Sequence, residues 1–202
     1  MSAQFTVALW LTLWAAACAI LAARPLIPNR SGTFALRFGP ALAIGLAAAA
    51  LLEPGAALAQ GTAGVMLAAA APIDAKTGYL FDSVTLPAAA VCILIAALER
   101  TATTALWGVA AIVAPLGVLA FVSRGGWIGW GDVKACLSLA IAFGSIGSAM
   151  ALFIASVLGL FAYAVRLHRG HSIPFGPHLA AGAATVIVFG SQARHLLQDL
   201  TR

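Results

Sequence analysis

Long runs of hydrophobic residues alternate with short polar stretches along the whole chain. A helix that crosses a hydrocarbon core about 30 Å thick needs roughly 20 mainly apolar residues. Charged residues, prolines and glycines divide the chain into apolar segments of about this length. The pattern therefore predicts an all-α fold, a polytopic membrane helix bundle with about eight transmembrane helices, at residues 4–23, 35–52, 56–73, 84–98, 102–122, 133–145, 147–166 and 177–194.

Two of these segments leave the number of spans open. Residues 133–166 are nearly continuous and are broken only by Gly144, Ser145 and Gly147, so seven spans result if no turn forms there. The fourth segment is short, and we expect residues before Val84 to complete it. There is no linker, so residues 1–202 are predicted to form a single membrane domain. Because no Lys or Arg precedes Arg24, we expect the first segment to be a retained span rather than a cleaved signal.

The composition supports a membrane protein. The chain is 62% hydrophobic and 8% charged with a mean hydropathy of +1.02, whereas soluble domains have about 25% charged residues. The lipid bilayer is thus the expected partner, and a disordered tail, a coiled coil and a free nucleic-acid-binding module are excluded. Cys18, Cys92 and Cys136 lie far apart without a C-x-x-C motif, which argues against a zinc ribbon and a disulfide framework. No metal and no cofactor are expected.

The distribution of basic residues predicts the orientation in the membrane, because cytoplasmic connections carry an excess of Lys and Arg. The second and sixth connections carry none. The side of the membrane opposite the odd connections has only three basic residues, which are Arg100, Arg194 and Arg202. The odd connections are therefore expected to face the cytoplasm and both termini the outside; their basic residues are Arg24, Arg30, Arg37, Lys76, Arg124, Lys134, Arg166 and Arg169.

The acidic residues give the candidate chemistry. Glu53, Glu99 and Asp199 fall at segment ends or in the polar tail, whereas Asp74 and Asp132 adjoin apolar runs at the expected cytoplasmic ends of their helices. Carboxylates at such places are costly and are usually functional or paired. Two nearby carboxyl groups can share one proton and act as base and acid on a water molecule.

The same residues allow other interpretations, and the sequence lacks the motifs of other catalytic sites. Asp74 and Asp132 alternatively form solvated helix ends or ion pairs with Lys76 or Lys134. There is no H-E-x-x-H zinc motif and no phosphate-binding glycine loop. A serine triad has no obvious nucleophile beside the histidines, which gather in the last cytoplasmic connection at His168, His171 and His178.

Three local sequences together resemble the type IV prepilin peptidases, a family of GxGD aspartic membrane peptidases. The first is Ile73-Asp74 followed by the stretch L-F-D-S-V-T-L-P at residues 80–87. The second is G-W-G-D-V-K at residues 129–134, which resembles the G-x-G-D-[VF]-K motif. The third is I-P-F-G-P at residues 173–177. The resemblance covers about residues 56–194 and identifies a short form of the family.

The resemblance implies an aspartic endopeptidase that removes the leader of type IV prepilins or pseudopilins at the cytoplasmic face of the cell inner membrane. Asp74 and Asp132 correspond to the catalytic pair, with Asp82 as a supporting residue that caps the fourth helix or orients the site. Gly129 and Gly131 are expected to allow unusual backbone angles and close approach. Lys134 either balances the negative charge of the pair or extends toward the membrane interface, and the second role is favoured.

The chain departs from the longer family members in its first connection. Residues 24–34 contain no cysteine, where long members carry a four-cysteine zinc module, and this argues against an N-methyltransferase activity. Phe81 replaces the proline of the first motif and loosens the expected turn. The short form is similar to peptidases that serve tight-adherence pili and some secretion systems; the pilin and the oligomeric state are left open.

Two other functions remain as alternatives to the peptidase. An ion- or proton-coupled membrane transporter would use the same carboxyl groups as relays, but it predicts inverted repeats and carboxylates near the middle of the membrane. An inactive peptidase-like assembly subunit of a pilus or secretion system is the other alternative, and retention of both aspartates argues against it.

Overall fold

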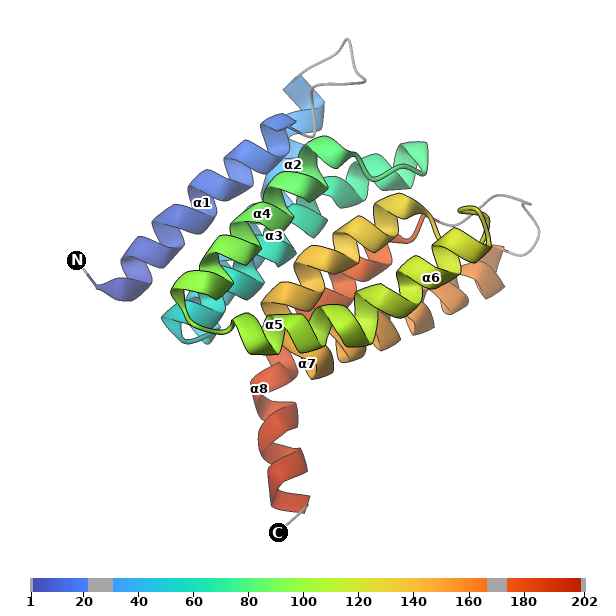
Figure 1. Cartoon of the computed structure of the whole chain (residues 1–202). Coiled ribbons are helices and arrows are strands. Elements are labelled where there is room, and N and C mark those ends of the chain that lie inside the picture. Colours follow the sequence, from blue (N-terminus) through green and yellow to red (C-terminus); the bar gives the residue numbers. More distant parts are fainter. Residues whose placement is uncertain (1, 22–30, 167–173, 201–202) are drawn as a thin grey trace.

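A computed structural model describes residues 2–21, 31–166 and 174–200, and in this part of the chain the secondary structure is entirely helical. Seven helices pack into one bundle (Figure 1). Three consecutive elements, α5, η1 and α6, continue into one another and count as one of the seven. The elements are α1 Ala3–Leu21, α2 Ser31–Leu51, α3 Pro54–Thr77, α4 Asp82–Leu98, α5 Ala102–Gly108, the π-helix η1 Val109–Val113, α6 Ala114–Val122, α7 Trp130–Arg166 and α8 Gly176–Leu200.

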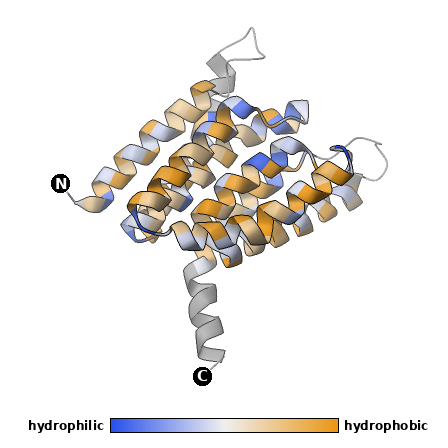
Figure 2. Cartoon of the chain, in the orientation of Figure 1, coloured by the Kyte–Doolittle hydropathy of each residue, from blue (hydrophilic) through white to orange (hydrophobic). Residues whose placement is uncertain are grey.

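Four of these stretches are long and apolar enough to cross a bilayer: α1, α3, the α5–η1–α6 helix and α7. Three shorter apolar helices accompany them, at Arg37–Leu51, Asp82–Leu98 and Gly176–Gly190. Hydrophobic residues cover the helix bodies, and the most hydrophilic residues gather toward the helix ends (Figure 2). The protein is therefore an all-α polytopic membrane protein, as the sequence predicts.

The chain reverses direction inside α7. Gly144 has φ 66° and ψ −171°, which is not helical. The Ser148 hydroxyl donates a hydrogen bond of 3.1 Å to the Leu139 carbonyl oxygen, nine residues earlier, whereas an unbroken helix would separate these residues by about 13.5 Å along its axis. Residues 130–143 and 145–166 thus form two limbs, and the break expected near Gly144 is present.

The reversal at Gly144 depends on glycine for two reasons. Its positive φ is unfavourable for a residue with a side chain, and an added Cβ would lie 2.9 Å from Thr104 Cγ2. We therefore expect Gly144→Ala to lower the free energy of unfolding by about 1–3 kcal/mol. Thermal unfolding in detergent, followed by circular dichroism, measures the loss. Gly39→Ala, where an added Cβ meets nothing within 4 Å, is the control, and equal melting of the two variants would contradict the strain at Gly144.

The helix α3 lies at the centre of the bundle and packs against α1, α2, α4, α7 and α8. Close approach depends on small residues: an added Cβ at Gly61 would lie 2.7 Å from Leu11 Cδ1 of α1, and one at Gly64 would lie 2.9 Å from Ile187 Cδ1 of α8. Lipid provides no hydrophobic drive between helices, so such contacts stabilise the bundle through van der Waals packing. This packing fixes the end of α3 that carries Asp74.

Several helix bounds differ from the sequence-based segments. The α2 helix begins at Ser31 and contains Arg37 as a buried residue, so the assignment of Arg37 to the first connection was wrong. The α8 helix continues to Leu200, so Asp199 lies in a helix rather than in a polar tail. The α4 helix starts at Asp82, two residues before the predicted fourth segment, and at 17 residues it remains one of the shorter apolar helices. Outside the described residues lie Arg24, Arg30, His168, Arg169, His171 and Arg202.

Candidate active site

Asp74 lies near the end of α3 and is held by the start of α8. The α3 helix ends at Thr77 and is followed by Gly78, whose left-handed conformation (φ 69°) lets its N–H donate a hydrogen bond of 2.8 Å to the carbonyl oxygen of Asp74. The Asp74 side chain is buried, and its Oδ2 accepts a hydrogen bond of 2.7 Å from the N–H of Gly176. Gly176 is the first residue of α8, where free N–H groups and the helix dipole favour a carboxylate. Asp74 therefore has a fixed orientation.

Gly176 has to be a glycine for this contact to form. An added Cβ would lie 2.8 Å from Asp74 Oδ2 and 3.0 Å from Asp74 Cβ. The sequence analysis used the I-P-F-G-P stretch only as the third motif of the family resemblance and gave it no role at the site. The structure instead brings this loop against a candidate catalytic carboxyl group 102 positions away.

Asp132 lies in the first turn of α7, close to the two motif glycines. Its N–H donates 3.1 Å to the Gly129 carbonyl oxygen, and an added Cβ at Gly129 would lie 3.3 Å from Asp132 Oδ2. An added Cβ at Gly131 would lie 2.9 Å from the Leu80 carbonyl oxygen, so this glycine lets α7 approach the segment between α3 and α4.

The expectation of unusual backbone angles at these two glycines was wrong. Neither Gly129 nor Gly131 has a positive φ. The turn between α6 and α7 is made earlier, at Arg124 (φ 52°) and Gly125 (φ 79°). Gly129 and Gly131 instead allow neighbouring atoms to approach the backbone closely, which was the second role expected of them.

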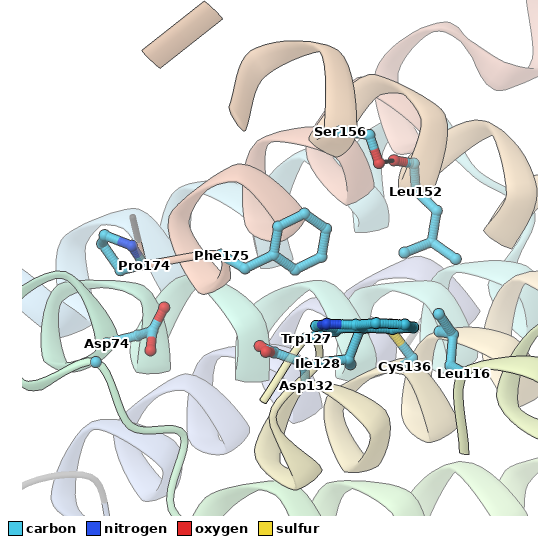
Figure 3. A pocket seen from close by; sticks show the side chains of 11 residues that line it. Asp74, Leu116, Trp127, Ile128, Asp132, Cys136, Leu152, Ser156, Pro174 and Phe175 are labelled. Carbon is cyan, nitrogen blue, oxygen red and sulfur yellow. Dashed lines mark hydrogen bonds between the residues drawn. The ribbon is translucent and has the colours of Figure 1, made fainter. Parts of the chain in front are cut away.

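Asp74 and Asp132 meet in one cavity of about 530 Å³, here called the aspartate cavity. The two carboxyl groups point toward each other in Figure 3. Neither forms an ion pair with Lys76 or Lys134 within the described part of the chain. The lining residues are Asp74, Gly78, Leu116, Trp127, Ile128, Asp132, Cys136, Leu152, Ser156, Pro174 and Phe175.

The cavity has an acidic side and an apolar side. In Figure 3, Asp74 lies on the left and Asp132 near the centre, while Leu116, Cys136 and Leu152 lie on the right. Sequence reasoning missed these apolar residues because they come from helix bodies that read as ordinary membrane spans. The cavity can therefore hold a polar group between the carboxyl groups and an apolar group beside them.

Asp82 and Lys134 form an ion pair at the edge of the site. Lys134 Nζ donates to both carboxylate oxygens of Asp82, each at 2.7 Å. The helix α4 begins after Phe81 without a side-chain cap, so the expected capping by Asp82 was wrong. The ammonium group of Lys134 binds Asp82 at this partly exposed edge, and its extension toward the membrane interface stays a prediction. The pair joins the first turn of α4 to the first turn of α7.

The described residues contain no group of three or more His, Cys, Asp and Glu side chains placed to hold a metal ion. His178, in the first turn of α8, interacts electrostatically with Asp74. The reactive groups of the site are thus a pair of carboxyl groups in a partly apolar cavity. Such a pair can activate water for hydrolysis.

Comparison with known proteins agrees with this chemistry. The chain is 35% identical over 179 residues to proteins named "Prepilin leader peptidase/N-methyltransferase" from Burkholderia pseudomallei strains 1026b and K96243. These matches cover 83% of this chain and 55% of each relative, so the chain spans about half the length of the curated relatives. No solved structure matches the chain at a significant level. The profile of the Type IV leader peptidase family matches residues 61–165, more than half of the chain, and this range contains both aspartates. The chain belongs to the type IV leader peptidase family.

Proposed function

We propose that this protein is a prepilin leader peptidase, an aspartic endopeptidase that cuts the leader from type IV prepilins or pseudopilins. The observation that carries the proposal is the meeting of Asp74 and Asp132, 58 positions apart in sequence, in one cavity. Membership of the leader peptidase family supports the substrate class. The transporter and inactive-subunit alternatives have no comparable observation in their favour.

In the proposed reaction, the two carboxyl groups share one proton and act on one water molecule. The ionised carboxylate takes a proton from the water, whose oxygen attacks the scissile carbonyl carbon. The protonated carboxyl group donates to the carbonyl oxygen, and the resulting tetrahedral intermediate collapses when a proton reaches the leaving amide nitrogen. The Gly176 N–H keeps Asp74 oriented through these steps. The reaction needs no metal and no covalent intermediate.

The proposed topology has eight crossings, with the odd connections and the aspartate cavity at the cytoplasmic face of the inner membrane. Three connections border the cavity, through Gly78 after α3, Trp127 and Ile128 before α7, and Pro174 before α8. These are the third, fifth and seventh connections. Arg124 lies in the fifth, and Lys76 and Lys134 lie near the adjoining ends of α3 and α7 rather than in the connections themselves. The reversal at Gly144 supplies the extra crossing.

The test is hydrolysis by the purified protein. Protein in detergent is incubated with a purified prepilin and the methyl donor S-adenosylmethionine, with and without a metal chelator, and the products are identified by mass spectrometry. We expect one cut at the leader junction, equal rates with the chelator, and a mature product without an added methyl group. Absence of any cut would contradict the peptidase, whereas a methylated product would contradict only the expectation drawn from the cysteine-free first connection.

The Asp82–Lys134 pair is proposed to position Asp132. The pair is partly exposed, so its contribution to stability is expected to be about 0.2–1 kcal/mol. Its removal in Lys134→Ala should nevertheless slow cleavage, because α7 loses its link to α4 two residues from Asp132. We expect the exchanged pair Asp82→Lys with Lys134→Asp to recover cleavage relative to either single exchange, as measured by initial rates. Equal rates in the single and double exchanges would contradict the positioning role.

A further inference from the structure

The apolar side of the aspartate cavity is lined by three helical segments. We call this part of the cavity the side groove and define it by Leu116 of α6, Cys136 of the first limb of α7, and Leu152 and Ser156 of the second limb. Figure 3 shows these residues on the side of the cavity away from Asp74. Ser156 is exposed, so the cavity reaches the molecular surface there.

The opening of the side groove lies among lipid-facing residues. Phe153 is 71% exposed and Leu160 is 68% exposed, and both flank Ser156 on α7. Ser156 donates its hydroxyl hydrogen to the Leu152 carbonyl oxygen at 2.8 Å, so even this polar group is satisfied within the helix. An opening of this kind suits an apolar helix that arrives through the bilayer and not a ligand that arrives from water.

One wall of the side groove is loosely attached to the bundle. The α5 helix is anchored, because Gly108 contacts the Ala140 carbonyl oxygen of α7 directly. The α6 helix has only Ala120 as a buried residue, and η1 between them has none. A π-helix followed by Pro115 also weakens the regular backbone ladder at this junction. The α6 helix is therefore only weakly packed against the bundle, and η1 at its N-terminal end forms a structural hinge.

We propose that the apolar helix of the prepilin enters through the side groove, between α6 and the second limb of α7, with α6 moving about η1 to admit it. This inference rests on the proposed function and adds the route and the docking surface. An apolar helix in the side groove places its end at Asp132, where the cavity becomes acidic. The family resemblance implies a substrate with a short basic leader next to an apolar membrane helix. The change from apolar to acidic along the cavity matches that order, with the basic leader at the carboxyl groups.

Site-specific photo-crosslinking tests the docking surface. Benzoylphenylalanine replaces one of two groove positions beside the lining residues, either Leu119, three residues after Leu116 on α6, or Leu160, four residues after Ser156 on α7. The variants carry Asp132→Asn, and membranes containing prepilin are irradiated. Matched controls carry the probe at Leu13 of α1 and Leu94 of α4, which are 61% and 59% exposed. We expect prepilin adducts from both groove positions and only background from both controls. Adducts from the controls at equal yield, or none from the groove positions, would overturn the proposal.

A second measurement separates the route from the chemistry. Pro115→Ala is expected to slow cleavage of full-length prepilin in membranes several-fold and to leave cleavage of a short soluble peptide spanning the junction unchanged. Equal effects on both substrates, or no effect on either, would overturn the hinge. Failure of the unmodified protein to cut either substrate would instead contradict the peptidase function itself.

Discussion

Asp74→Asn and Asp132→Asn are each expected to reduce prepilin cleavage by about 100- to 10,000-fold, the range typical of losing a positioned acid–base group. Asparagine keeps the shape of the side chain but cannot take up or release the required proton. Because both carboxyl groups line one cavity, loss of either should stop the shared reaction. Initial rates with purified protein and purified prepilin measure the effect.

The double variant and a distant acid provide the controls. Groups that act as a unit are strongly non-additive, so Asp74→Asn with Asp132→Asn should be no slower than the worse single variant. Glu53→Gln changes an exposed acid that precedes α3 at its other end and should cut at the normal rate. Normal cleavage by either aspartate variant would contradict the assignment of the pair.

Gly176→Ala should cause the next largest loss, of about 100-fold in turnover, which is the typical cost of misplacing a catalytic group by about 1 Å. The added methyl group would lie 2.8 Å from Asp74 Oδ2. The carboxyl group must then move, and its 2.7 Å hydrogen bond to the Gly176 N–H is strained or lost. Steady-state kinetics with prepilin measure the loss.

The Gly39→Ala variant controls for this substitution, because the added methyl group there meets nothing within 4 Å. It should keep full activity. Thermal unfolding of both variants distinguishes displacement of Asp74 from general misfolding: Gly176→Ala is expected to remain folded with reduced turnover. Full turnover in folded Gly176→Ala would contradict the role given to the α8 start.

Much of the fold could be predicted from hydropathy, because lipid requires each crossing helix to be long and apolar. The break in α7 was visible as Gly144 near Gly147, since a reversal needs a residue that tolerates positive φ. The π-helix η1 had no sequence signal, because Val109–Val113 is as apolar as its surroundings. The burial of Arg37 within α2 was equally invisible to a count of charges in connections.

The candidate site was partly predictable. Asp74 and Asp132 were identified from their motifs and from their positions at helix ends, and these features belong to the local sequence. The residues that contact these site residues could not be predicted, because such contacts depend on how helices distant in sequence pack together. Lys134 meets Asp82 across 52 positions, and Gly176 meets Asp74 across 102. No local sequence pattern indicates contacts between residues so far apart in the chain.

Binding of a prepilin junction peptide whose scissile amide is replaced by a hydroxyl-bearing isostere tests the joint action of the two aspartates most directly. The hydroxyl group imitates the tetrahedral intermediate, so the unmodified protein should bind this peptide at least about 100-fold more tightly than the matching amide peptide. Either Asp74→Asn or Asp132→Asn alone should abolish that preference. Equal binding of the two peptides by the unmodified protein, or a preference that survives loss of one aspartate, would show that the carboxyl groups do not act together on the reacting carbon.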